Sequence, residues 1–411
     1  MIDPSTAAGD SDCATSSNED HQKIRVVLFT RSLERGGAET QLVSLAKELD
    51  RSQFDVTVVT FYAGGELDEE LRSRGIPLVS LDKTGRWDTI GFGMRLVRQL
   101  RRLDPHVIHA YLDPPNLFAA LAKPLINCTA LVWGVRASDM ELSRYDWTWR
   151  LVFCLERFFS FLPDAIIANS NAGRHHYTCS GFPDAKFRVI DNGIDVRRYV
   201  PDLSAGEQIR ASWSVPPAAS LIGLIARIDP MKDHSTFLHA ASRLLETHPH
   251  VRFVCVGDGP DWHARPLREL AVKLGIDGRV SWVGHVRDMP AAYNALNLTT
   301  LCSAFGEGFP NAVGEAMATG VPCIVTDVGD ARRIVGDDRF VVPRCDPEAL
   351  ATAWRWWLDL APSAQRSFCE TARMRAESAF SVDAMVARVA GVYRELAGST
   401  SLGVPIARLI H

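Results

Sequence analysis

The chain has 411 residues but no C-x-x-C pair, and its nine cysteines are scattered along its length. An odd number of dispersed cysteines argues against a disulfide framework, so we expect reduced thiols in a cytosolic protein. The formal net charge of -4 lacks the basic excess that nucleic-acid-binding proteins usually carry, and we expect no nucleic-acid partner. No Walker A loop occurs either, which leaves an ATPase without support.

Long apolar runs are missing as well. The most apolar stretch, residues 117–135, contains Lys123, Pro124 and Asn127, so we expect no transmembrane helix. The first 22 residues are rich in Ser, Asp, Ala and Thr and lack the apolar core of a signal peptide. We therefore expect a disordered tail over residues 1–23 and a cytoplasmic location.

Short apolar, β-branched runs alternate with helical patterns through the rest of the chain. After the first run and a glycine turn, Leu42, Leu45, Ala46 and Leu49 recur at helical spacing. Strands are expected at 25–30, 56–60, 106–110, 130–135 and 165–168, and again at 221–226, 251–256, 279–283, 298–301 and 322–326. Strands that alternate with helices predict an α/β fold with two parallel-sheet domains.

A change of composition marks the expected boundary between the domains. Residues 196–220 interrupt the alternation with prolines and clustered small residues, which favours a linker at 199–219. The first domain then covers 24–198 and the second covers 220–380, and each is long enough to bury its own core. A helical pattern follows at 381–396, and residues 397–411 are expected to form a loose tail.

The strongest local signal is the stretch 302–320, in which Glu307 and Glu315 are separated by seven residues. A Gly-Phe-Pro turn lies between them, and Asn311 predicts the N-cap of a helix over about 312–319. Free N–H groups at a helix start bind phosphate or hydroxyl oxygens, and carboxylates accept hydrogen bonds from hydroxyls. The pattern suits a polyhydroxylated ligand. Acids that merely complement the helix dipole are an equal alternative.

A second signal follows the expected strand at 221–226. Arg227 and Lys232 lie in the next loop, where open α/β sheets bind their ligands. Arginine grips phosphate in a bidentate manner and lysine acts as a point charge, so the pair is suited to a diphosphate. The alternative is two solvated surface cations, which is the common fate of these residues. Their position after the strand favours the functional interpretation.

Six stretches, taken together, resemble one family. They are Gly36-Gly37-Ala38-Glu39, Pro105-His106-Val107-Ile108-His109, Asn192-Gly193-Ile194-Asp195, Arg227 through Lys232, Val256-Gly257-Asp258-Gly259-Pro260, and Glu307 through Glu315. In this order and spacing the chain resembles the retaining glycosyltransferases of family 4, also called group 1, over about residues 24–395. The resemblance implies the GT-B architecture, in which two Rossmann-like domains with parallel sheets face each other across a cleft.

The resemblance also implies a division of labour. The C-terminal domain would bind a UDP- or GDP-sugar donor, the N-terminal domain would bind the acceptor, and the helix at 381–396 would cross back onto the N-terminal domain. Arg227 and Lys232 would stabilise the leaving nucleoside diphosphate. Glu307 would contact the donor sugar, and Glu315 would hold the ribose hydroxyls.

Further substrate-binding positions follow from the same resemblance. They are Gly36, Gly37, Asn192, Gly257, Val286, Phe309, Asn311 and Ala312. The two N-domain glycines would let the backbone approach the diphosphate, and Val286 would border the base. The implied reaction retains the anomeric configuration, and the nucleotide-sugar is a co-substrate rather than a cofactor. No metal is expected.

The chain departs from the family's pattern at the end of its 106–110 strand. Relatives often carry His-x-His there, whereas this chain has His109-Ala110-Tyr111. His109 is a catalytic candidate, and a strand-end histidine bonded to its surroundings is an equal alternative. Tyr111 is a candidate to supply the missing hydrogen bond. Arg136 replaces a common histidine, and it either meets an acidic acceptor or forms a salt bridge within the domain.

The acceptor is expected to be a glycan, a lipid-linked molecule or a small molecule, in polysaccharide or glycoconjugate synthesis. The arginine-rich amphipathic helix at 92–103 and the aromatic stretch 151–162 suit an anionic membrane surface, although a core helix with a solvated arginine face is favoured. An inverting GT-B enzyme or an epimerase is an alternative that needs a base, for which Asp113 and Asp139 are candidates. A non-catalytic, nucleotide-sugar-binding partner subunit is the other alternative.

Overall fold

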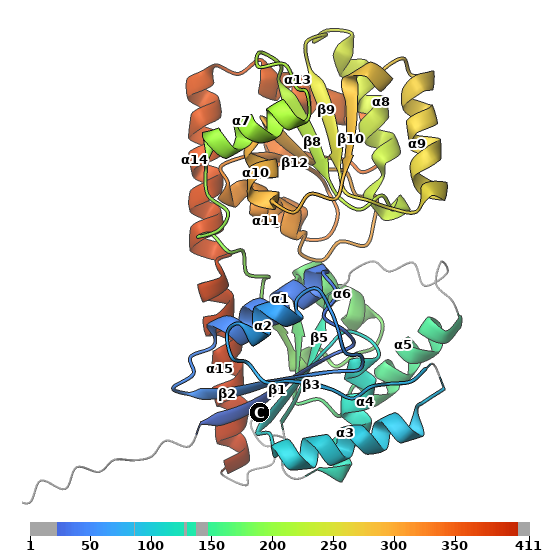
Figure 1. Cartoon of the computed structure of the whole chain (residues 1–411), viewed down its shortest axis with the longest axis vertical. Coiled ribbons are helices and arrows are strands. Elements are labelled where there is room, and N and C mark those ends of the chain that lie inside the picture. The colour runs from blue at the N-terminus through green and yellow to red at the C-terminus, as the bar shows by residue number, and fades with distance from the viewer. Residues whose placement is uncertain (1–22, 86, 127–129, 137–146, 402–411) are drawn as a thin grey trace, which may run out of the picture.

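The computed structural model describes residues 23–85, 87–126, 130–136 and 147–401. Over these residues the chain forms two α/β domains, one above the other, with a parallel sheet in each (Figure 1). The expected fold class is therefore confirmed. Of the expected tails at 1–23 and 397–411, residues 1–22 and 402–411 lie outside the described residues.

The N-domain contains a seven-stranded parallel sheet in the order β3-β2-β1-β4-β5-β6-β7. Its strands are β1 (Ile24–Thr30), β2 (Phe54–Thr60), β3 (Leu78–Ser80), β4 (Val107–Tyr111), β5 (Ala130–Val135), β6 (Ala165–Ala168) and β7 (Phe187–Val189). Its helices are α1 (Gly37–Glu48), α2 (Asp68–Arg72), α3 (Ile90–Leu103), α4 (Pro115–Ala122), α5 (Trp147–Phe159) and α6 (Asn171–Cys179). The direction of the strand order reverses between β1 and β4, which makes this the topological switch point.

The C-domain repeats the design with a six-stranded parallel sheet in the order β10-β9-β8-β11-β12-β13. Its strands are β8 (Leu221–Ile225), β9 (Arg252–Val256), β10 (Val280–Gly284), β11 (Leu298–Leu301), β12 (Cys323–Thr326) and β13 (Val341–Val342). Its helices are α7 (Leu203–Ser212), α8 (His234–Leu245), α9 (Asp261–Lys273), α10 (Met289–Asn294), α11 (Asn311–Ala318), α12 (Ala331–Val335), α13 (Pro347–Leu358) and α14 (Pro362–Ala379).

Both faces of each sheet are covered, which explains the continuous apolar runs in the sequence. In β1, Val26 and Leu28 pack into a core shared with α1, while Val27 and Phe29 pack into a core shared with α3 and α4. The C-domain sheet has the same arrangement, with one core against α11 and α14 and another against α8 and α13.

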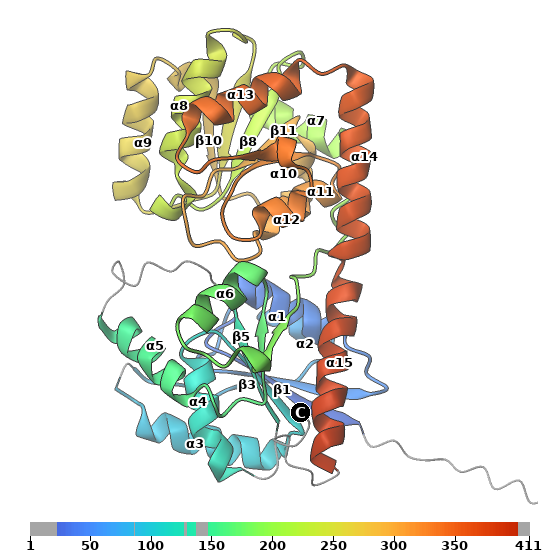
Figure 2. The same ribbon diagram turned by 180° about the vertical axis from the view of Figure 1, so that it is seen from behind.

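The two domains share their last helices. Figure 2 shows α14 running along the C-domain and α15 (Val382–Ser401) continuing along the N-domain on the same side of the molecule. The α15 side chains Met385 and Tyr393 belong to the N-domain core. The predicted helix thus crosses back, but it continues to Ser401, into the segment that was expected to be a tail.

Other differences from the sequence prediction come from short elements. The strands β3, β7 and β13 were not predicted, because two or three residues are too short for a periodic signal. The expected linker at 199–219 contains α7, whose N-terminus is capped by the side chain of Asp202. This helix packs against α10, so tertiary contact stabilises a segment whose prolines suggested a linker.

The longest helices are α14 and α15, and neither is a membrane span. Among the described residues, no helix combines the length and apolar character that crossing a bilayer requires.

We predict opposite effects from alanine at two glycines. A methyl group at Gly193 would lie 2.8 Å from Cα of Val382, at the start of α15, where backbone must move to admit it. Gly193→Ala should therefore lower the free energy of unfolding by about 1–3 kcal/mol. Gly391 has open space within the same helix, so Gly391→Ala should raise it by about 0.5–1 kcal/mol. Thermal unfolding measures the direction of both changes. Equal melting temperatures of the two variants would contradict the packing described for Gly193 and Gly391.

Candidate active site

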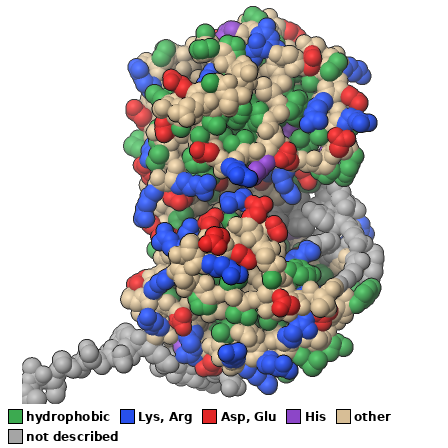
Figure 3. Space-filling model, viewed as in Figure 1, with side chains coloured by type: hydrophobic (Ala, Val, Ile, Leu, Met, Phe, Trp, Pro, Cys, Tyr) green, Lys and Arg blue, Asp and Glu red, His purple; other side chains and the backbone are tan. Residues whose placement is uncertain are grey.

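A cleft of about 1010 Å³ lies between the two domains, at the carboxyl ends of both sheets. Figure 3 shows Lys and Arg side chains along the boundary between the domains, with acidic side chains just below. Most of the predicted site residues line this cleft: Gly36, Gly37, Arg136, Asn192, Arg227, Lys232, Val286, Glu307, Phe309, Asn311, Ala312 and Glu315. The fold therefore brings together residues that are far apart in the sequence.

The loop after β8 carries the two predicted diphosphate ligands. Asp229 caps the short 3-10 helix Pro230–Lys232 by accepting a hydrogen bond from Met231 N, which fixes the path of the loop. Gly257 lies beside this loop, and a Cβ there would come within 2.2 Å of the carbonyl oxygen of Ala226. Gly257 does not line the cleft. Its absent side chain instead allows the turn after β9 to approach the backbone next to Arg227.

Glu307 is held before any ligand arrives. The ammonium of Lys232 forms an ion pair with its Oε1, and the hydroxyl of Ser303 donates to the same oxygen at 2.5 Å. Both side chains of the ion pair are largely buried, with 17% of Lys232 and 7% of Glu307 exposed. A buried carboxylate needs such partners. The ion pair also brings the two predicted catalytic residues into direct contact.

Helix α11 begins at the cleft without a side-chain cap. Its N-cap is Pro310, one residue earlier than predicted, and no side chain accepts its first N–H groups. The side chain of Asn311 turns to the N-domain instead, where Asn192 donates to its oxygen at 2.7 Å. The N–H groups of Asn311 and Ala312 belong to a first turn that has no partner within the helix, and such N–H groups suit phosphate.

Glu315 lies deeper in the cleft than predicted, in the second turn of α11. The Tyr293 hydroxyl donates to its Oε2 at 2.8 Å, and Tyr199 also bonds to it. Burial raises the pKa of Glu315, and the two tyrosine hydroxyls partly oppose that shift. Val286 lies on the same cleft wall. This end of the cleft offers one fixed carboxylate beside apolar surface.

The N-domain contributes the start of α1 and an amide network. The N-cap of α1 is Gly36, which has no side-chain cap, so a second helix N-terminus faces the cleft. A Cβ on Gly37 would lie 3.5 Å from Nδ2 of Asn311, so α1 and α11 approach each other closely. Arg136 donates to Oδ1 of Asn192, which orients the amide that holds Asn311.

His109 is separated from these groups. It is fully buried in β4 and does not line the cleft, and its Nδ1 lies 2.7 Å from the Tyr393 hydroxyl on α15. Burial, followed by the charge of Arg136, holds the pKa of His109 well below its ordinary value. Of the two interpretations that the sequence left open for His109, this arrangement corresponds to the histidine that is bonded to its surroundings within the domain. The structure does not bring His109 to Arg227, Lys232, Glu307 or Glu315, which line the cleft.

Tyr111 and Arg136 lie against each other. The Arg136 guanidinium carbon is 4.9 Å from the centroid of the Tyr111 ring, which is buried. Tyr111 lines a separate cavity next to the cleft, together with Asp113. The other candidate base, Asp139, lies outside the described residues.

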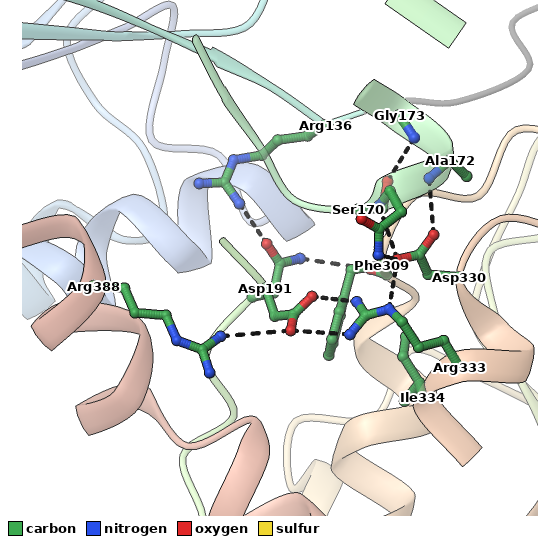
Figure 4. A network of polar contacts seen from close by, with 12 residues as sticks. Arg136, Ser170, Ala172, Gly173, Asp191, Phe309, Asp330, Arg333, Ile334 and Arg388 are labelled. Carbon is green, nitrogen blue, oxygen red and sulfur yellow. Dashed lines mark hydrogen bonds and ion pairs between the residues drawn. The ribbon is translucent and has the colours of Figure 1, made fainter. Parts of the chain in front are cut away.

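A polar network joins the domains beside the cleft (Figure 4). Asp330, after β12, accepts hydrogen bonds at 2.9 Å from the backbone N–H groups of Asn171 and Ala172, at the N-terminus of α6. Arg333 bonds to Asp330 at 2.8 Å and forms an ion pair with Asp191 of the N-domain. The carboxylate of Asp330, in the C-domain, thus complements the dipole of α6 in the N-domain.

The same network reaches the loop that carries Glu307. The N–H of Asp330 donates to the carbonyl oxygen of Gly308 at 3.1 Å, directly after Glu307. A Cβ on Gly308 would lie 2.6 Å from Oδ1 of Asn169 in the N-domain, so this loop is packed against the opposite domain. The position of Glu307 is therefore coupled to the position of the domains.

Several cleft residues were not predicted from the sequence. They are Arg35, Glu39, Thr40, Glu66, Arg198, Tyr199, His285, Arg287 and Met289. Arg198 and Tyr199 follow the predicted Asn192–Asp195 motif, and that proximity was the available signal. Glu39 closes the quoted Gly36–Glu39 motif at the start of α1, and the remaining residues lie in segments whose local patterns look like ordinary surface. Within the described residues, no group of three or more His, Cys, Asp or Glu side chains is arranged to hold a metal ion.

Two family models match this chain, one over each domain. A family model described as "Glycosyltransferase Family 4" matches residues 35–198, and one described as "Glycosyl transferases group 1" matches residues 219–359. Together the two models match well over half of the chain.

Relatives and solved structures agree with these models. A Bacillus subtilis protein named "Putative glycosyltransferase EpsF" is 25% identical over 307 residues, which are 74% of this chain and 79% of the relative. The Escherichia coli "UDP-Gal:alpha-D-GlcNAc-diphosphoundecaprenol alpha-1,3-galactosyltransferase" is 22% identical, over 81% of this chain and 87% of the relative. HepE of Anabaena, solved with UDP and glucose, aligns with a TM-score of 0.79 at 21% identity, over 90% of this chain and all of that one.

We predict that Asp330→Ala loosens the two domains. The variant leaves two N–H groups of α6 and the guanidinium of Arg333 without their carboxylate, so the free energy of unfolding should fall by about 1.5–3 kcal/mol. Small-angle X-ray scattering should show a larger radius of gyration. Asp327→Ala, which removes a half-exposed partner of Arg332, is the control and should change neither quantity. Unchanged melting and scattering in Asp330→Ala would contradict the role of this network.

Proposed function

The chain belongs to the group 1 glycosyltransferases, and we propose that it transfers a sugar from a UDP- or GDP-sugar to a glycan or lipid-linked acceptor, with retention of configuration. The observation that carries the proposal is the composition of the cleft. Five arginines and Lys232 line it together with four glutamates, Glu39, Glu66, Glu307 and Glu315, and two helix N-termini open into it. Such a cleft is suited to a diphosphate joined to two polyhydroxylated rings.

The donor fits this cleft in one direction. The diphosphate would lie between Arg227 and Lys232 and the first turn of α11, where a guanidinium and free N–H groups face the same space. The ribose would bind Glu315, whose ionised form accepts hydrogen bonds from hydroxyls. The transferred sugar would lie at Glu307, and the base would lie beside Val286.

The groups around Glu307 suggest how the bond breaks. As the bond between the sugar and the phosphate lengthens, negative charge grows on the leaving phosphate, and Arg227 and Lys232 would stabilise it. The acceptor hydroxyl would attack the sugar carbon from the same face, and its proton would pass to the departing phosphate. The carboxylate of Glu307 would hold the sugar hydroxyls and stabilise positive charge on the ring.

We also propose that no metal takes part. The support is the cation content of the cleft, since fixed guanidinium and ammonium groups perform the charge neutralisation that Mg²⁺ provides elsewhere.

We predict that one nucleoside diphosphate stabilises the protein in the presence of EDTA. In thermal unfolding with UDP, GDP and ADP and their sugar conjugates, a ligand at about 100 times its dissociation constant adds about 2.7 kcal/mol. Arg227→Ala and Glu315→Ala should abolish this stabilisation, because they remove the diphosphate and ribose contacts. Arg268→Ala, on the exposed face of α9, is the control for loss of a positive charge.

Turnover separates catalysis from binding. Release of nucleoside diphosphate from the donor should fall at least tenfold in Glu307→Gln, and the anomeric proton coupling of the product should show retention. Nucleotide binding without turnover would favour the non-catalytic partner subunit, and an inverted product would favour the inverting alternative.

We further propose that the N-domain meets the cytoplasmic face of a membrane that carries the acceptor. Large apolar side chains are exposed on and around α3, α4 and α5: Trp87, Ile90, Met94, Leu121, Leu125, Leu151, Phe158 and Phe161. Arg98, Arg101, Arg102 and Arg157 lie on the same helices, and Figure 3 shows apolar and basic side chains together in this lower right region. Such a mixture suits an anionic lipid surface.

We predict salt-sensitive flotation with vesicles that contain phosphatidylglycerol, and none with purely zwitterionic vesicles. The double variant Trp87→Ser/Phe158→Ser should reduce flotation several-fold, since both rings are more than two-thirds exposed. Trp262→Ser removes an equally exposed ring from the C-domain and serves as the control. Wild-type flotation that is absent, or equal loss in both variants, would sink the membrane proposal.

A further inference from the structure

Two tyrosine hydroxyls hold the carboxylate of Glu315, and neither tyrosine was predicted from the sequence as a site residue. Tyr293, on α10, donates to Oε2 of Glu315 at 2.8 Å, and the hydroxyl of Tyr199 bonds to the same carboxylate. Both tyrosines are buried, and their ring centroids lie 5.9 Å apart with the ring planes at 69°. Glu315 lines the cleft, so the carboxylate that these tyrosines hold also borders the space for a ligand. We call these three side chains the carboxylate clamp.

The segment that carries Tyr199 links the two domains, and side chains of the C-domain fix it in place. The guanidinium of Arg373, on α14, donates to the carbonyl oxygen of Tyr199 at 3.4 Å and to that of Ala318, at the end of α11. The carboxamide of Asn294, on α10, donates to the carbonyl oxygen of Val200 at 2.9 Å. The segment is therefore tied to α10 and α11, the two helices that supply the other members of the clamp.

The hydrogen bonds of the clamp decide how Glu315 can bind a ligand. An ionised carboxylate has about four acceptor positions, and the two tyrosine hydroxyls use only part of this capacity. The rest suits the two adjacent hydroxyls of a ribose. A carboxyl group in a half-buried place ionises less readily unless donors stabilise its charged form. The tyrosines therefore both orient the carboxylate and favour the form that accepts hydrogen bonds.

The charges around the clamp agree with these roles. Burial raises the pKa of Glu315, while the hydrogen bonds from Tyr293 and Tyr199, followed by the charge of Arg198, oppose that shift. Burial, followed by the charge of Glu315, raises the pKa of both tyrosines, so both hydroxyls keep their protons and remain donors. The other titratable groups that act on the two tyrosines are Arg35, from the N-domain side of the cleft, and Cys323, on β12.

We infer that Tyr199 and Tyr293 are positioning residues that keep Glu315 ionised and aimed at a ribose, and that the clamp thereby selects ribonucleotides over nucleotides without ribose hydroxyls. The hydroxyls of both tyrosines act through Glu315. A ligand without ribose hydroxyls leaves acceptor positions of this carboxylate unpaired, which costs affinity. The selection is lost when Glu315 takes up a proton. This inference rests on the proposed function, which places the ribose of the donor at Glu315.

Isothermal titration calorimetry tests the clamp by comparing two ligands, the nucleoside diphosphate that stabilises the wild type and its 2′,3′-dideoxy counterpart. The terminal phosphate titrates alike in both ligands, so the ratio of their dissociation constants isolates the contact with the ribose hydroxyls. At neutral pH the wild type should bind the ribose form about tenfold or more tightly than the dideoxy form. Between about pH 8 and pH 5 this preference should decline, as Glu315 becomes protonated.

Phenylalanine variants keep the rings and remove the hydroxyl donors. Tyr199→Phe and Tyr293→Phe should each lower the ribose preference several-fold at neutral pH. Each should also move the midpoint of its pH dependence upward by about one pH unit, because the ionised carboxylate loses a hydrogen bond. Glu315→Gln should bind weakly, with a small ribose preference that does not change with pH.

The matched control is Tyr393→Phe, which removes a buried tyrosine hydroxyl that is bonded to His109 in the N-domain. This variant should keep both the ribose preference and the pH midpoint of the wild type, even where its melting temperature falls. The control therefore separates a general loss of stability from the loss of a group that acts on Glu315.

Three results would overturn the inference. They are equal binding of the ribose and dideoxy forms by the wild type, a ribose preference in the wild type that does not change with pH, and a wild-type preference and midpoint in both Tyr199→Phe and Tyr293→Phe. The last result would leave the two tyrosines a structural role alone. Failure of every nucleoside diphosphate to bind the wild type would instead count against the proposed donor site, so the two failures are distinguishable.

Discussion

Asp330 constrains both the position of the domains and the shape of the loop that carries Glu307. It belongs to the C-domain, yet it caps α6 of the N-domain through two backbone N–H groups. The backbone N–H of Asp330 donates a hydrogen bond to the carbonyl oxygen of Gly308, which follows Glu307 in the chain. A buried carboxylate is costly unless it is fully bonded, so opening the domains would leave this group and Arg333 partly unsatisfied. The geometry of the site is therefore tied to the closed arrangement of the two sheets.

In the cleft between the domains, Lys and Arg side chains are in excess over carboxylates, and the carboxylates of Glu307 and Glu315 are held in place by hydrogen-bonding partners. Glu307 already has Lys232 and Ser303 as partners, and Glu315 has Tyr293 and Tyr199. These partners hold the two carboxylates in place, while Arg35 pairs with Glu66 and Glu70 and Arg136 donates to Asn192. The separate N-domain cavity that Tyr111 and Asp113 line has the opposite balance, with carboxylates in excess over its one lining cation.

Glycines and buried histidine show how motif residues can matter without touching a ligand. Gly193 and Gly257 lie in predicted motifs, but their missing side chains admit α15 and the Arg227 loop, respectively. His109 lies in a motif position that suggested catalysis, and its imidazole bonds to Tyr393 inside the N-domain. Sequence motifs of this kind record the packing that supports a site as well as the site itself.

The sequence alone determined the alternation of strands and helices, the two-domain architecture and the set of Arg227, Lys232, Glu307 and Glu315, which the fold brings together in the cleft. These follow from local periodicity, turn residues and short motifs, which are properties of neighbouring positions. The tertiary structure decided the rest. It placed His109 in the core and Asp330 against α6, and it brought Tyr199 to Glu315 and Glu156 to Asp113. These pairings join residues on separate elements, and the physical reason is that burial and contact arise only when the sheets and helices pack. No local pattern encodes them.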